Sequence, residues 1–84
     1  MEHNEKAADL AFRAKFLETR LKMLDARIQF IANELERAMW FRMSDRQAEL
    51  LKQHEGAVNT AEKLVAELEA IFKEQIENSR STGA

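Results

Sequence analysis

The sequence predicts an all-α fold: a long antiparallel helical hairpin, a two-helix coiled coil that assembles with a second copy into a dimeric four-helix bundle. Three observations predict it. The 84 residues include no proline and only two glycines, Gly56 and Gly83, so almost nothing interrupts a helix. Apolar residues recur every three or four positions through the first half of the chain. A second apolar stripe follows the same rhythm on the far side of that segment.

The first helix is expected over residues 4–42. Its main apolar seam alternates spacings of four and three residues, which are the a and d positions of a coiled coil. The seam consists of Leu10, Ala14, Leu17, Leu21, Leu24, Ile28, Ile31, Leu35 and Ala38. Such a seam is typical of a helix that packs on another helix.

A short turn is expected at residues 43–44. Ser44 is a favourable N-cap, and Gln47 three residues later completes a Ser-x-x-Gln capping box. Asp45 adds a negative charge to the new first turn. Because no residue here is typical of a left-handed helix end, one continuous helix is an alternative.

The second helix is expected over residues 45–77, which completes a single domain, 1–77. It carries three adjacent apolar columns, the pattern of a helix in a bundle. The columns are Leu50, Ala57, Leu64 and Ile71; His54, Ala61 and Leu68; and Leu51, Val58, Val65 and Phe72. The small polar residues 78–84 predict a disordered tail.

Folding the second helix back on the first gives a consistent register. Leu17 would meet Ile71, Leu24 would meet Leu64, and large residues would face small ones in several layers. The predicted core within the hairpin is Leu17, Leu21, Leu24, Ile28, Ile31, Leu35, Leu64, Leu68 and Ile71.

Charges beside the seam fit the hairpin on one flank only. Arg13 would face Glu74 and Arg20 would face Glu67, but acidic residues would face each other on the opposite flank. A parallel homodimer of the first helix could instead pair Arg13 with Glu18. Exposed ion pairs contribute only about 0.2–1 kcal/mol each, so the parallel coiled coil stays an alternative.

The second stripe predicts an interface with another chain. Aromatic side chains bury roughly 150–250 Å² each, so this stripe would exceed the apolar area that soluble monomers leave uncovered. The predicted interface residues are Phe12, Phe16, Met23, Phe30, Met39, Trp40 and Phe41. The partner is expected to be a second copy or a helix of another protein.

Composition argues against several classes of function. Cysteine is absent, and the only histidines, His3 and His54, belong to no metal-binding or catalytic motif, so we expect no enzyme, metal or cofactor. His54 would occupy a core layer opposite Leu35 and is interpreted as a packing residue. The net charge of −2 and an acidic second helix disfavour nucleic acid, although an RNA-binding hairpin dimer is an alternative.

No segment is apolar enough to predict a membrane span, and residues 1–6 do not have the pattern of a signal peptide. We therefore expect a cytoplasmic protein-binding module, such as an adaptor, a small chaperone or an assembly component.

In length, hairpin shape, short turn and the polar opening Ser44-Asp45-Arg46-Gln47, the chain is similar to the small co-chaperones of type III secretion needles. This resemblance implies, as one expectation, a co-chaperone of a bacterial secretion system; no site residue is carried over. Small secreted hairpins with a Trp-x-Gly turn differ, because Trp40-Phe41-Arg42 lacks the glycine.

Overall fold

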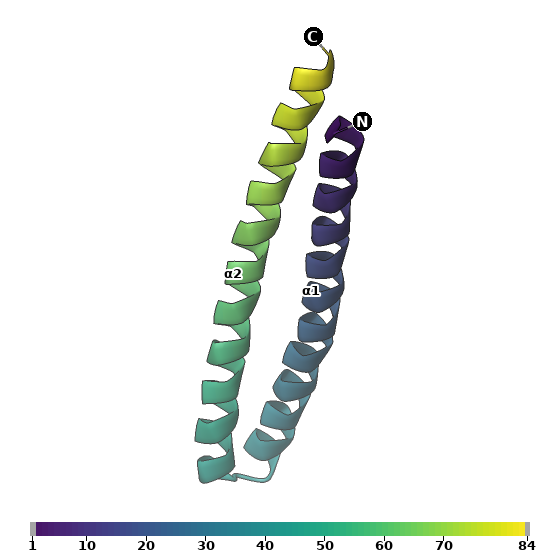
Figure 1. Cartoon of the computed structure of the whole chain (residues 1–84). Helices are drawn as coiled ribbons and strands as arrows, with labels where there is room; N and C mark the ends of the chain where they lie inside the picture. Colours follow the sequence, from purple (N-terminus) through teal and green to yellow (C-terminus); the bar gives the residue numbers. More distant parts are fainter. Residues whose placement is uncertain (1, 84) are drawn as a thin grey trace.

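The protein is a pair of long helices joined by a tight turn. The computed structural model describes the backbone of residues 2–83 and the side chains of residues 5–80. Helix α1 spans Glu2–Trp40 and α2 spans Ser44–Gly83, with no strand in the described part (Figure 1). The helices are antiparallel, so both chain ends lie at the same end of a hairpin measuring 62 × 15 × 13 Å. The predicted hairpin is confirmed, and one unbroken helix is wrong.

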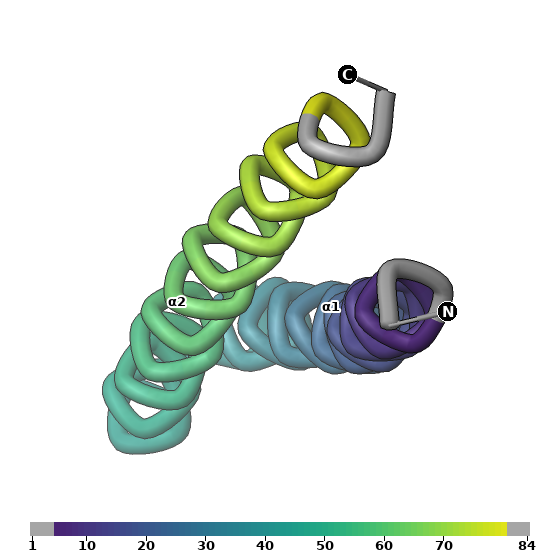
Figure 2. Tube along the Cα trace, turned by 45° about the horizontal axis from the view of Figure 1, so that its top comes forward, coloured from purple at the N-terminus to yellow at the C-terminus, as the bar shows by residue number. Residues whose placement is uncertain are grey.

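The two helices hold together along one narrow seam. Figure 2 shows that their axes cross at an angle rather than running parallel. One cluster joins Leu17 of α1 to Leu64 and Ile71 of α2, and a second joins Ala38 to Leu50. Both clusters agree with the register expected from the sequence. The buried residues are Leu10, Ala14, Leu17, Ile31, Ala38, Leu50, Leu64 and Ile71.

Much of the predicted core is only half-buried. Two helices enclose the column of each that faces the other, and the next column lies at the margin of the contact. Several predicted core residues occupy this margin. Leu10, Ala14 and Ala38 of the predicted seam, and Leu50 of the predicted second-helix columns, are buried. The half-buried residues of the predicted core are Leu21, Leu24, Ile28, Leu35 and Leu68.

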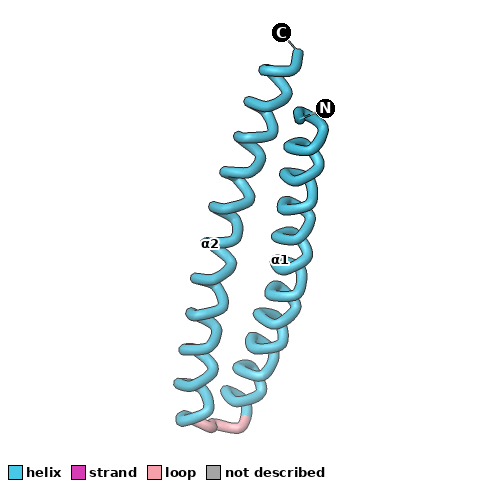
Figure 3. Tube along the Cα trace, viewed as in Figure 1, coloured by secondary structure: helices cyan, strands magenta, loops and turns pink. Residues whose placement is uncertain are grey.

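The end of α1 is a Schellman motif, which the sequence did not predict. Met43 N–H donates to Ala38 O at 2.9 Å, and Arg42 N–H donates to Met39 O at 3.2 Å. Arg42 adopts the left-handed conformation with φ 53°, the position that glycine usually occupies in this motif. The connection between the helices is therefore very short (Figure 3).

The start of α2 corrects the predicted capping box. The carbonyl of Met43 accepts the backbone N–H of Gln47 at 2.9 Å, so Met43 rather than Ser44 is the N-cap. The side chain of Gln47 does not fold back on its own helix. Its Nε2 donates to the Ala38 carbonyl at 3.2 Å and ties the two helices together at the turn.

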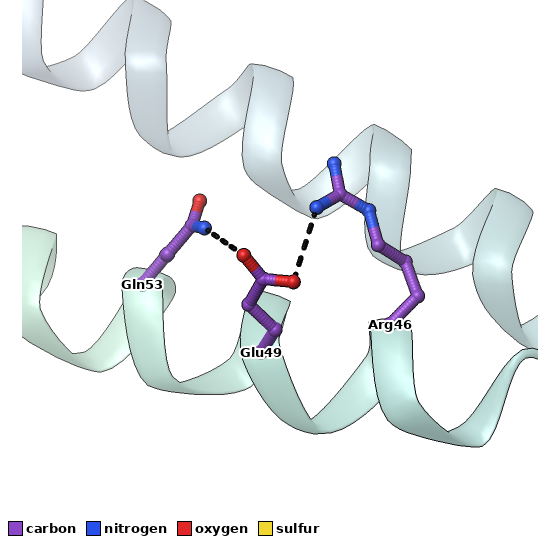
Figure 4. Close-up of polar contacts among 3 residues, drawn as sticks. All are labelled: Arg46, Glu49 and Gln53. Carbon is purple, nitrogen blue, oxygen red and sulfur yellow. Dashed lines mark hydrogen bonds and ion pairs between the residues drawn. The ribbon is translucent and has the colours of Figure 1, made fainter.

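The exposed side of α2 near the turn carries a short polar chain. Glu49 accepts a hydrogen bond from Gln53 at 3.3 Å and lies 3.5 Å from the guanidinium of Arg46 (Figure 4). Each such contact one turn apart contributes about 0.2–0.5 kcal/mol to a helix. These contacts support the first turns of α2 but do not join it to α1.

Helix α2 extends further than predicted. The expected end was near Glu77, followed by a tail over residues 78–84, but the helix continues to Gly83. No proline follows Glu77, and polar residues such as Asn and Ser cost at most about 0.7 kcal/mol each in a helix. The tail prediction is thus corrected for residues 78–83, and residue 84 lies outside the described part.

We expect Arg42→Gly to raise the free energy of unfolding by about 1 kcal/mol, because a left-handed residue with a Cβ costs about 1–2 kcal/mol. Urea denaturation monitored by circular dichroism would measure the change. The matched control is Ala48→Gly, an exposed position inside α2, which should lower stability by about 1 kcal/mol. No gain for Arg42→Gly would contradict the assigned turn.

The seam also predicts unequal stability losses at two neighbouring residues. Ile71 is 2% exposed and Phe72 is 41% exposed. Ile71→Ala should therefore lower the free energy of unfolding by about 2–5 kcal/mol, and Phe72→Ala by clearly less, although phenylalanine is larger. The same denaturation experiment compares them. A greater loss of stability for Phe72→Ala would show that the face of α2 assigned to the seam is wrong.

Candidate protein-binding surfaces

An aromatic stripe runs along the outer side of α1. We define it as Phe12, Phe16, Met23 and Phe30, whose side chains are 55–72% exposed. Their spacings of four and seven residues keep them on one side of the helix. These large apolar side chains lie within one helix face, so the stripe is an exposed apolar surface rather than a set of isolated residues.

Two hollows lie between this stripe and α2. The first, of about 360 Å³, is bordered by Phe12 and Phe16 on one side and by Ala70 on the other, with Leu17 and Ile71 from the seam. The second, of about 270 Å³, is lined by a set that includes Met23, Leu24 and Leu64. Arg20 lines both hollows, so they follow one another along the same side of the hairpin.

The rims of the first hollow carry opposite charges. The α1 rim of both hollows is basic, with Arg13, Arg20 and Arg27. The α2 rim is acidic at the first hollow, with Glu67 and Glu74, and is uncharged at the second. Arg20 also lies over the Phe16 ring, 5.9 Å from its centroid, which is a cation–π distance. The side of the hairpin with the two hollows is therefore polar along both edges and apolar between them.

The predicted ion pairs across the hairpin do not form in the single chain. Arg13 and Glu74, like Arg20 and Glu67, share the first hollow without coming within 4 Å of one another. Over residues 5–80, the ion pairs are local to one helix: Arg37–Glu34 and Arg46–Glu49. The charges beside the stripe are thus not neutralised by direct contact.

The other predicted interface residues lie away from the stripe, at the turn. Trp40 ends α1 and is 80% exposed, and Phe41 stands exposed in the turn itself. Met39 is exposed beside them and lines a surface hollow with Trp40 and Arg42. The structure does not bring Met39, Trp40 and Phe41 together with the stripe, and in the single hairpin they do not cover the core.

A second apolar surface lies on the opposite side of the seam, and the sequence analysis did not assign it. Its exposed residues on α2 are Leu51, Val65, Phe72 and Ile76. The signal was present in the third apolar column of the second helix. The sequence pattern predicts that this column belongs to a stripe covered within a bundle, whereas one partner helix covers only the column that faces it.

The described residues offer no constellation for metal chemistry. No group of three or more His, Cys, Asp or Glu side chains among them is placed to hold a metal ion. His54 is half-buried, and the side chain of His3 lies outside the described residues. Within that same range, neither helix contains a stretch long and apolar enough to cross a bilayer.

No protein-family model matches this chain, and comparisons with curated proteins and with solved structures find no significant match.

Proposed function

We propose that this chain is a non-enzymatic protein–protein interaction module that assembles with a second copy through the aromatic stripe and its hollows. It would act as an adaptor, a small chaperone or an assembly component. The observation that carries the proposal is the exposure of the stripe beside rims of opposite charge. Large exposed aromatic patches bordered by polar residues mark protein interaction sites.

The stripe has the area that a dimer needs. Phenylalanine side chains bury about 150–250 Å² each, so covering the stripe of both copies removes on the order of 1,000 Å² from water. Specific interfaces begin at about 1,000–1,200 Å² of total buried surface. The stripe and the neighbouring rims together reach this range.

The charges favour one arrangement of the two copies. A two-fold axis parallel to the helices sets α1 of each copy against α2 of the other. Arg13 and Arg20 then approach Glu74 and Glu67 of the second copy. A two-fold axis perpendicular to the helices would instead oppose arginines to arginines, which costs free energy. The favoured product is a four-helix bundle with antiparallel neighbours.

Two alternatives use the chain differently. A helix of another protein could occupy the same hollows, as expected for a secretion co-chaperone, and it would compete with the second copy. An RNA-binding role is disfavoured, because Glu67 and Glu74 stand beside the arginines that would have to attract phosphates. A parallel coiled coil of α1 would need Leu17 and Ile31, which are already buried against α2.

We expect that reversing the charges of one rim or of the other gives two variants that dimerise only with each other. Arg13→Glu with Arg20→Glu makes both rims acidic, and Glu67→Arg with Glu74→Arg makes both rims basic. Each variant alone should be monomeric in light scattering at low salt, because like charges meet. An equimolar mixture should form a dimer no longer than the wild-type hairpin of 62 Å, as measured by small-angle X-ray scattering.

Phe16→Ser with Phe30→Ser should also yield monomers, and Phe41→Ser at the turn is the matched control that should stay dimeric. Circular dichroism would show that each variant remains helical. A monomeric wild-type chain at high concentration would refute the proposal.

A further inference from the structure

The side of the hairpin away from the hollows carries what we name the acidic-rimmed face. Its apolar residues on α2 are Leu51, Val58, Val65, Phe72 and Ile76, which are 41–56% exposed except for the half-buried Val58. Leu51, Val58, Val65 and Phe72 follow one another at intervals of seven residues, and Ile76 follows Phe72 by one turn. They therefore form a continuous ridge along most of α2.

This ridge continues into the margin of the seam. His54, Ala61 and Leu68 lie one turn before Val58, Val65 and Phe72, and they are half-buried. On α1 the corresponding marginal residues Leu21, Ile28 and Leu35 are also half-buried. The face thus combines an exposed ridge of α2 with the partly open layer between the two helices, and a third helix could bury both.

Carboxylates border this face on both helices. On α1, Glu18 and Asp25 stand one turn after Ala14 and Leu21, next to the marginal column. On α2, Glu55, Glu62 and Glu69 stand one turn after Leu51, Val58 and Val65. All these carboxylates are exposed. The nearest basic residues lie one column further out, and they are Lys15, Lys22, Lys52 and Lys73.

The charge pattern excludes a second copy as the natural occupant. The first hollow beside the aromatic stripe has one basic and one acidic rim, so one two-fold arrangement pairs opposite charges. The acidic-rimmed face has carboxylates on both rims, so every two-fold arrangement opposes carboxylates to carboxylates. The same carboxylates repel phosphate, whether in nucleic acid or on an anionic membrane surface.

We propose that the acidic-rimmed face binds a basic amphipathic helix of another protein, one with an apolar stripe flanked on both sides by Lys or Arg. The ridge from Leu51 to Ile76 extends for roughly 38 Å at 1.5 Å per residue, so the partner helix has about seven turns. Its apolar stripe fills the open layer, and its flanking cations meet Glu18, Asp25, Glu62 and Glu69. The site is separate from the dimer interface, so both can be occupied together.

The test uses two designed helical peptides of about 28 residues, the length that matches this ridge. Both have Leu at heptad positions a and d; one has Lys at e and g, and the other has Glu there, so neither pairs with itself. Fluorescence anisotropy at low salt would measure binding to the full chain. The Lys peptide should bind at least about tenfold more tightly than the Glu peptide, and its affinity should fall as salt is added.

Variants on the two sides of the hairpin locate the site. Val65→Ser with Phe72→Ser should weaken the Lys peptide at least about tenfold, whereas Phe16→Ser with Phe30→Ser on the opposite side should leave it unchanged. Glu62→Lys with Glu69→Lys should shift the preference toward the Glu peptide.

The proposal is overturned if the chain binds neither peptide or binds both equally. It is also overturned if only the Phe16 and Phe30 substitutions abolish binding. Because dimer formation is measured by light scattering on different variants, loss of the dimer and loss of peptide binding are distinguishable.

Discussion

The structure depends on one constraint: a helix can bury only the column of side chains that faces its partner. In this hairpin the buried column of α1 runs from Leu10 to Ala38, and that of α2 from Leu50 to Ile71. Burial of these aliphatic residues is the main force that joins the helices, since the ion pairs over residues 5–80 are local. The apolar columns on either side of the buried ones stay exposed, and we interpret them as protein-binding surfaces.

Two apolar surfaces lie outside the seam: the aromatic stripe with its hollows, and the acidic-rimmed face. Their bordering charges are arranged differently, and from this difference we infer different partners for them. Along the first hollow, basic residues of α1 stand across from acidic residues of α2, so the surface is complementary to its own rotated copy. On the acidic-rimmed face, the glutamates of α2 stand across from Glu18 and Asp25, so only a foreign basic surface is complementary. In both proposals, apolar area would supply affinity and charge would select the partner.

The sequence predicted the hairpin, the register and the exposure of Phe12, Phe16, Met23 and Phe30, because helical periodicity alone determines which residues share a side. It predicted a short turn near residue 43 but not the conformation of that turn. Arg42 has no intrinsic preference for the left-handed region, and it adopts that conformation because the packed helices leave a short gap to close. Half-burial of Leu21 and Leu68 also escaped prediction, since it depends on the angle at which the helices cross and not on spacing.

The short turn limits the insertions and deletions that this chain can tolerate during evolution. Met43 is both the last residue of the Schellman motif and the N-cap of α2, so no spare residue separates the helices. Inserting one residue there without compensation would turn α2 by about 100° about its own axis. The buried column would swing toward water, and the column of Glu49, Gly56, Lys63 and Ala70 would take its place in the seam. Insertions and deletions at this point should therefore be purged by selection.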